Sequence, residues 1–355
     1  MLEIRNEACV FVDCLVFIWN ESKLSDKCSI ILYVVIEKND YVLKKSGGRA
    51  MTKTIQKIVP HLWYDKEAKE AVEFYTSIFP YSQITDITTL HDTPSGDCDQ
   101  VSFEIWGQKF MAIDGGPFFK MNPSISFMVN FDPSQEKDAE EKISEVWNKL
   151  SEGGLALMPF GEYPFSKKYG WIQDKYGLSW QLILTNPEGE ERPAIMPSLL
   201  YVGEECGKAE EAIQFYTSVF KDAKQGNLAR YPKGMEPDKE GTVMFADLML
   251  ENYWFVAMDS AHEHKFSFNE AISFMVYCDT QEEIDYYWEK LSFVPESEQC
   301  GWLKDQYGLS WQIVPSIMDE MMRNGTTEQI NSVMQVLLKM KKLNLAELQR
   351  AYKES

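Results

Sequence analysis

The chain has 355 residues, of which 45% are hydrophobic and 25% are charged, a composition typical of a globular protein with two or three domains. Its formal net charge of −20 at pH 7 argues against nucleic acid held through phosphates and against an anionic membrane surface. The seven cysteines form no CxxC pair, so we expect reduced thiols in a cytoplasmic protein.

The first fifty residues do not resemble the rest of the chain. Their two apolar runs, Cys9–Trp19 and Cys28–Ile36, are each too short to span a bilayer. A Gly-Gly pair at 47–48, which a ribosome-binding sequence can encode, lies just before Met51. Residues 1–50 are therefore interpreted as a non-native or mis-annotated extension, with translation starting at Met51. An extra hairpin or an amphipathic arm is the alternative.

From residue 57 the pattern predicts a βαβββ unit. Lys57–Tyr64 is predicted to be a short strand, and apolar residues at helical spacing between Ala68 and Phe79 predict a helix that Pro80 ends. Three further strands are predicted at Ser82–Leu90, Gln100–Trp106 and Lys109–Asp114.

A second unit of the same kind follows. Apolar residues between Ala139 and Leu150 predict its helix, and Ala156–Lys168 is predicted to be a loop. Its strands are predicted at Ser124–Asn130, Tyr169–Asp174 and Leu178–Leu184.

Three segments recur in the same order. Glu70–Phe79 matches Glu211–Phe220, Ile125–Val129 recurs identically as Ile272–Val276, and the motif Gly-Trp-x-x-Asp-x-Tyr-Gly-Leu-Ser-Trp-Gln occurs at 170–181 and 301–312. Such self-similarity indicates a duplicated domain. The predicted boundaries are 57–185 for the first domain, 186–194 for a linker, 195–316 for the second domain and 317–355 for a C-terminal helical segment.

The C-terminal segment is predicted to form one or two amphipathic helices rich in lysine. Membrane or acidic-partner binding is one hypothesis. We favour the other, in which the helices pack back on the body and leave the basic face in solvent.

The helix motif Glu-Ala-x-x-Phe-Tyr and the hairpin motif resemble the PhnB-like branch of the vicinal-oxygen-chelate (glyoxalase/bleomycin-resistance) superfamily, a branch often labelled 3-demethylubiquinone-9 3-methyltransferase. The resemblance implies an α+β fold: tandem domains, each of two βαβββ modules, with cup-shaped mixed sheets, flanking helices and additional C-terminal helices. Four modules could make one chain a pseudo-dimer, as a monomer or within a homodimer. The methyltransferase label is not supported, because no glycine-rich turn for S-adenosylmethionine is present.

The resemblance also indicates where relatives hold a divalent metal. In the first domain these places carry His61, Asp114, a position near Ser124, and Gln181. In the second domain they carry Ser198, Met258 or Asp259, Ala271 and Gln312. One imidazole and an amide are a poor donor set, so no metal is expected, with His61, Gln181 and Asp114 as weak candidates. We expect instead that His61 is hydrogen-bonded within the cup.

Strand alternation and the resemblance together predict the residues that face the cups. The candidates for ligand binding are His61, Trp63, Ser124, Ser126, Met128, Trp171, Gln181, Ser198, Leu200, Ser273, Met275, Trp302 and Gln312. No catalytic set can be assembled from the sequence.

Three functions stay open. The favoured one is binding of a small, partly apolar molecule in a cup without a catalytic metal. The second is a metal-dependent lyase, isomerase or dioxygenase of the same superfamily. The third is a structural or regulatory module whose cups are filled by side chains.

Overall fold

The computed structural model describes residues 32–37, 40–45, 51–53, 56–93 and 95–355, which fall into two units divided after residue 55. In the first unit, β1 (Leu32–Glu37), β2 (Asp40–Lys45) and β3 (Met51–Lys53) form an antiparallel sheet. The apolar run Cys9–Trp19 lies outside the described residues, and the start of translation at Met51 stays a prediction.

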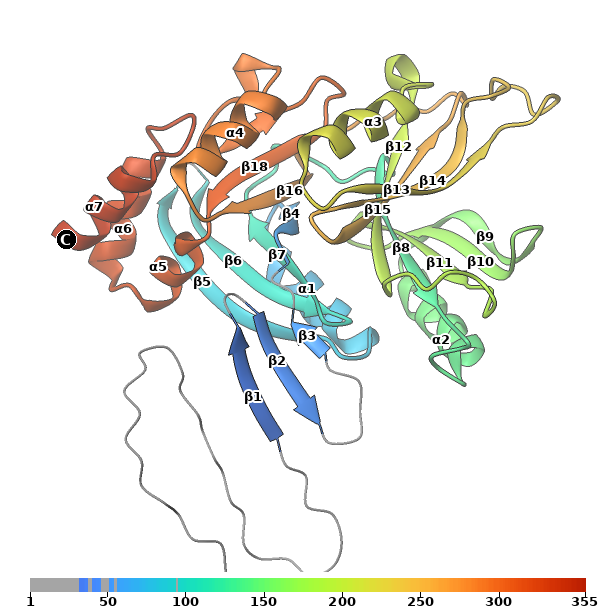
Figure 1. Cartoon of the computed structure of the whole chain (residues 1–355), viewed down its shortest axis with the longest axis horizontal. Coiled ribbons are helices and arrows are strands. Elements are labelled where there is room, and N and C mark those ends of the chain that lie inside the picture. Colours follow the sequence, from blue (N-terminus) through green and yellow to red (C-terminus); the bar gives the residue numbers. More distant parts are fainter. Residues whose placement is uncertain (1–31, 38–39, 46–50, 54–55, 94) are drawn as a thin grey trace, which may run out of the picture. The chain divides into compact units, whose positions relative to one another are not determined.

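The second unit begins with the first repeat, whose modules are each built around one helix (Figure 1). Its elements are β4 (Ile58–Tyr64), α1 (Ala68–Ile78), β5 (Gln83–Thr93), β6 (Gly96–Ile105), β7 (Gln108–Asp114), β8 (Ile125–Phe131), α2 (Ala139–Ser151), β9 (Leu155–Tyr163), β10 (Ser166–Gln173) and β11 (Ser179–Leu184). The predicted loop Ala156–Lys168 is wrong, because this segment forms β9 and the beginning of β10.

The second repeat follows the same order with a shorter final module. Its elements are β12 (Ile195–Tyr201), a short 3₁₀ turn η1 (Gly203–Glu205), α3 (Ala209–Val219), β13 (Lys224–Arg230), β14 (Val243–Leu250), β15 (Tyr253–Asp259), β16 (Ile272–Cys278), α4 (Gln281–Leu291), a second 3₁₀ turn η2 (Pro295–Ser297), β17 (Trp302–Lys304) and β18 (Ser310–Pro315).

The two large sheets are each assembled from both repeats. One has the order β17-β18-β16-β4-β7-β6-β5, and the other has the order β13-β14-β15-β12-β8-β11-β10-β9. The joins are antiparallel, with His61 opposite Ser273 in the first sheet and Ser198 opposite Ser126 in the second. The predicted α+β fold with tandem repeats is confirmed, and the modules pair between repeats, as in an internal pseudo-dimer.

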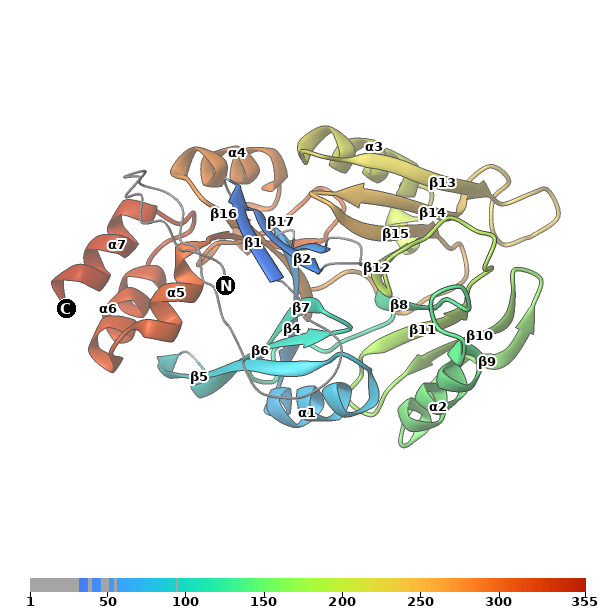
Figure 2. The same ribbon diagram turned by 60° about the horizontal axis from the view of Figure 1, so that its bottom comes forward.

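Helices α1 and α4 pack on the seven-stranded sheet, and α2 and α3 pack on the eight-stranded sheet (Figure 2). Between helices and sheets lies one continuous apolar core that includes Trp180 and Trp311, both fully buried. Asp174 and Asp305 accept hydrogen bonds from these indoles at 2.8 Å each. The opposite faces of the sheets are concave and hold the candidate site.

The chain ends in three helices, α5 (Ile317–Asn324), α6 (Thr327–Leu337) and α7 (Leu345–Glu354), where one or two were predicted. They pack back on the body through buried Met318, Met321 and Val333, which share an apolar cluster with Val59 of β4. The lysines of this segment are exposed. No helix among the described residues is long and apolar enough to cross a membrane.

Candidate functional site

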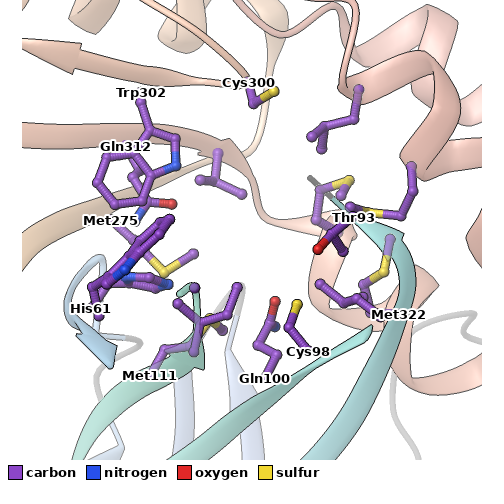
Figure 3. A pocket seen from close by; sticks show the side chains of 18 of the residues that line it. His61, Thr93, Cys98, Gln100, Met111, Met275, Cys300, Trp302, Gln312 and Met322 are labelled. Atoms are coloured by element: carbon purple, nitrogen blue, oxygen red, sulfur yellow. The ribbon is translucent and has the colours of Figure 1, made fainter. Parts of the chain in front are cut away.

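A cavity of about 280 Å³ lies between the seven-stranded sheet and the C-terminal helices. Its walls come from β4 to β7, from β16 to β18, and from α5, α6 and the segment that follows α6. Figure 3 shows His61, Met275, Trp302 and Gln312 on one side of the cavity, and Cys98 with Met322 across from them. We call this cavity and its sheet face the first cup.

The floor of the first cup is a row of residues that lie opposite one another on neighbouring strands. The pairs are Ser102 with Met111, Met111 with His61, His61 with Ser273, and Ser273 with Ser310. Directly paired residues project to the same face of a sheet. The row therefore places His61 in the middle of the concave face.

His61 is the most unusual group of this floor. Its side chain is almost fully buried, at 4% exposure, and Nδ1 has no hydrogen-bond partner. Burial lowers the pKa of His61 to about 3, so the imidazole is neutral near pH 7. The expectation that His61 is hydrogen-bonded within the cup is wrong: among the described residues its only polar or aromatic partner is the edge-on ring of Trp302, at 5.5 Å.

Gln312 provides the second polar group of the floor. Its Nε2 donates to Ser273 Oγ at 3.0 Å, and no donor among the described residues reaches its Oε1. Trp302 lies directly opposite Gln312 on the neighbouring strand. The indole of Trp63 stands beside Trp302, with 6.1 Å between ring centroids, and its Nε1 donates to the carbonyl of Gly116 at 2.8 Å. A neutral imidazole and a free amide oxygen thus lie next to an aromatic wall.

The remaining walls are mainly apolar and rich in sulfur, and their polar members are Thr93, Ser95, Gln100 and Asp319. Met318 and Met322 come from α5 and Met334 from α6, and Cys98 and Cys300 line the cavity with them. Burial raises the pKa of both cysteine thiols, so they remain uncharged. Flexible, polarisable side chains of this kind adapt to apolar ligands of varied shape.

The eight-stranded sheet has an equivalent concave face, which we call the second cup. Here the matching row is Asp247, Val256, Ser198, Ser126 and Ser179. Gln181 Nε2 donates to Ser126 Oγ at 2.8 Å and to Ser198 Oγ at 3.3 Å, and Gln181 Oε1 accepts from Tyr169 at 2.7 Å.

The structure divides the predicted ligand-binding residues between the two cups. Those on the first face are His61, Trp63, Ser273, Met275, Trp302 and Gln312. Those on the second face are Ser124, Ser126, Met128, Trp171, Gln181, Ser198 and Leu200. Grouping His61 with Gln181 in one cup was wrong, because β4 and β11 belong to different sheets.

The predicted weak metal set does not assemble. His61 and Gln181 are in different sheets, and Asp114 Oδ1 instead accepts from the backbone N of Ala68, at the start of α1, at 2.8 Å. Its counterpart Asp259 accepts from the backbone N of Gly207 at 2.7 Å. No group of three His, Cys, Asp or Glu side chains suited to a metal occurs among the described residues. The first cup offers one imidazole, two thiols and the carboxylate of Asp319, which already accepts from Tyr277 at 3.0 Å, and this set fits a divalent ion poorly.

Sequence reasoning missed most of the cavity wall, because only five of its 23 lining residues were predicted. Cys98 and Gln100 alternate on β6, and Met111 and Ile113 alternate on β7, a pattern that does mark one face of a strand. The methionines of α5 and α6 carried no such signal, because an amphipathic helix does not reveal which surface it covers.

Both repeats of the chain are similar to known proteins. A family model described as 3-demethylubiquinone-9 3-methyltransferase matches residues 56–183 and again residues 193–314. A solved PhnB protein from Bacillus cereus is 40% identical, covering 37% of this chain and 100% of its own, with a TM-score of 0.33.

Two further solved structures are similar to parts of the chain. A protein from Staphylococcus aureus is 31% identical over 37% of this chain and 98% of its own, with a TM-score of 0.16. Glyoxalase I from Zea mays is 12% identical over 75% of this chain and 96% of its own, with a TM-score of 0.47. No curated protein matched the chain.

Proposed function

Because the chain belongs to the 3-demethylubiquinone-9 3-methyltransferase family, a PhnB-like branch of the vicinal-oxygen-chelate superfamily, we propose that its first cup binds a small organic molecule. The molecule is uncharged, has a mainly apolar body and carries one hydrogen-bonding group. The observation that carries this proposal is the buried, unpartnered imidazole of His61 on the floor of a cavity of about 280 Å³.

Energetic reasoning supports a polar contact at His61. A buried polar atom without a partner costs about 1–3 kcal/mol, so such atoms are rare in folded proteins. A ligand hydroxyl or amide could bond to the neutral imidazole and to Gln312 Oε1 together. Its apolar body would contact Trp63, Trp302 and the methionines. An ionised ligand is disfavoured, because an unpaired charge is expensive to bury and the carboxylate of Asp319 in the cavity wall already accepts from Tyr277.

Binding alone accounts for these features. The family description names a methyltransferase, but the sequence has no glycine-rich turn that would hold S-adenosylmethionine. One fold can support many activities, so the family name does not decide between them.

The proposal is tested with N-phenyl-1-naphthylamine, a neutral apolar dye that fluoresces when it is bound. We expect saturable binding that EDTA does not change. A methyl group at Gly115 would overlap the indole of Trp63, so Gly115→Ala should weaken binding about tenfold, or about 1.4 kcal/mol.

Gly161→Ala is the matched control, because nothing lies within 4 Å of an added Cβ at that position. It should bind the dye like the wild type. The proposal fails if the wild type shows no saturable binding, or if Gly115→Ala binds as tightly as Gly161→Ala.

A further inference from the structure

We infer that the second cup is closed by the chain's own side chains, so that each chain has a single ligand site, in the first cup. The ligand site in the first cup rests on the proposed function. Closure of the second cup rests instead on a comparison of the two cups, which are internal copies of each other. Each position in one cup can be compared with its counterpart in the other.

The glutamines at the two floors differ in their partners. Gln312 has one hydrogen bond, to Ser273, whereas Gln181 has three, to Ser126, Ser198 and Tyr169. The oxygen that is free in the first cup is therefore occupied in the second by a protein hydroxyl. Burial also raises the pKa of Tyr169, which keeps this hydroxyl protonated as a donor.

The residue that fills this space comes from an insertion. Tyr169 and Cys300 are counterparts, since each immediately precedes the glycine of the repeated hairpin motif. The ring of Tyr169 packs on Tyr163 and Phe165, with centroids 5.3 and 5.0 Å away. Both partners belong to the β9–β10 hairpin, which has no counterpart of that length in the second repeat. A phenol thus fills the place that a small thiol occupies in the first cup.

The other side of the second cup is closed from the linker. Asp247 stands where the first cup has Ser102, and Arg192 Nε lies 2.9 Å from Asp247 Oδ2. The guanidinium also stacks over the ring of Trp254, 4.1 Å from its centroid. The side chains of Arg192 and Asp247 are only 12% and 2% exposed. An ion pair this buried, with an aromatic contact, holds the linker on the sheet.

The middle of the second cup is filled by apolar side chains. Met128, Met196 and Val256 form a buried cluster, with Trp254 and Met258 packed against it. Ser198 replaces His61, and its hydroxyl accepts from Gln181. No unpartnered imidazole remains there to attract a ligand.

Dye stoichiometry tests the inference, measured by fluorescence titration and by native mass spectrometry. The triple variant Tyr169→Cys/Arg192→Ala/Asp247→Ser gives the second cup the cysteine and the serine that the first cup has at Cys300 and Ser102. It removes Asp247 together with Arg192, so that neither charge is left unpaired. Cys300→Tyr places a phenol in the first cup. Arg230→Ala is the matched control, because it removes an exposed arginine paired with Glu210. Circular dichroism establishes that each variant is folded.

We expect one equivalent of N-phenyl-1-naphthylamine on the wild type and on Arg230→Ala, none on Cys300→Tyr, and two on the triple variant. Two equivalents on the wild type, one remaining on Cys300→Tyr, or only one on the folded triple variant would overturn the inference. If the triple variant does not fold, the other two measurements decide. No dye on the wild type but one equivalent on the triple variant would contradict the proposed function and leave closure of the second cup supported.

Discussion

His61 shows how one side chain can be constrained by its neighbours across the sheet. Ser273, which lies opposite it, bonds to Gln312, and Met111 on the other neighbouring strand offers no polar hydrogen. The imidazole is therefore left neutral and unpartnered at the cavity floor, with its pKa lowered to about 3 by burial. This protonation state links the stability of the fold to pH.

We predict that the wild type loses stability relative to His61→Leu as the pH falls. The unfolded chain takes up a proton on His61 near pH 6.5, whereas the folded chain does not until about pH 3, so protonation favours unfolding between these values. From pH 7 to pH 5 the relative loss should be about 2 kcal/mol.

Urea denaturation of both proteins at the two pH values measures this change in the free energy of unfolding. His91→Gln, which removes an exposed histidine outside the cavity, serves as the control. An unchanged difference between wild type and His61→Leu across this range would show that His61 is protonated equally in both states.

The repeated hairpins are held by an aspartate that joins the two sheets. Asp305, in the turn between β17 and β18, accepts from the backbone N of Tyr307 at 2.9 Å and of Leu309 at 3.0 Å. It also accepts from Tyr216 of α3 at 2.7 Å and from Trp311 at 2.8 Å. Because α3 packs on the eight-stranded sheet, this carboxylate connects a turn of one sheet to a helix of the other.

We therefore predict that Asp305→Asn lowers the free energy of unfolding by about 2–4 kcal/mol. All four groups around the carboxylate donate hydrogen bonds to it, and the NH₂ group of asparagine cannot accept them. Burial raises the pKa of Asp305 to about 6, so the measurement is made at pH 8, where the carboxylate is ionised. Asp279→Asn, at an exposed position, should leave chemical denaturation unchanged. Equal midpoints for the two variants would contradict the proposed role of the carboxylate.

The two repeats cannot be separated without dividing both sheets. Strand β4 pairs with β16, and β12 pairs with β8, so each join connects the first repeat to the second. A single apolar core also includes residues of both, among them Trp180 and Trp311. The linker, although exposed at residues 186–191, is therefore not a hinge between independent bodies.

We predict that cutting the linker leaves the molecule in one piece. A protease site inserted between Glu188 and Gly189 should be cleaved readily, and the two fragments should still elute together in size-exclusion chromatography. They should separate only in denaturant. Fragments that separate in native buffer would mean that each repeat closes its own sheet.

Much of this architecture was predictable from the sequence, because helical spacing and the repeated motifs are local signals. The helices and most strands of the first repeat lie where the periodicity placed them, and Trp180 and Trp311 of the repeated motif are both in the core. The pairing of the modules was not predictable, since the local patterns that mark a strand do not specify its partner strand. The same ambiguity explains why His61 was assigned to the cup of Gln181.

This pairing also sets an order for synthesis on the ribosome. The eight-stranded sheet is drawn from one continuous stretch between residues 125 and 259, so it can close while the chain is still growing. Strand β4 pairs with β16, which is synthesised about two hundred residues later. Until then the edge of β4 is unpaired and can bind other strands. A chain truncated after β15 would thus contain every strand of the eight-stranded sheet but only β4 to β7 of the other. That incomplete sheet would expose an unpaired edge prone to aggregation, and it would include His61 but no complete binding pocket.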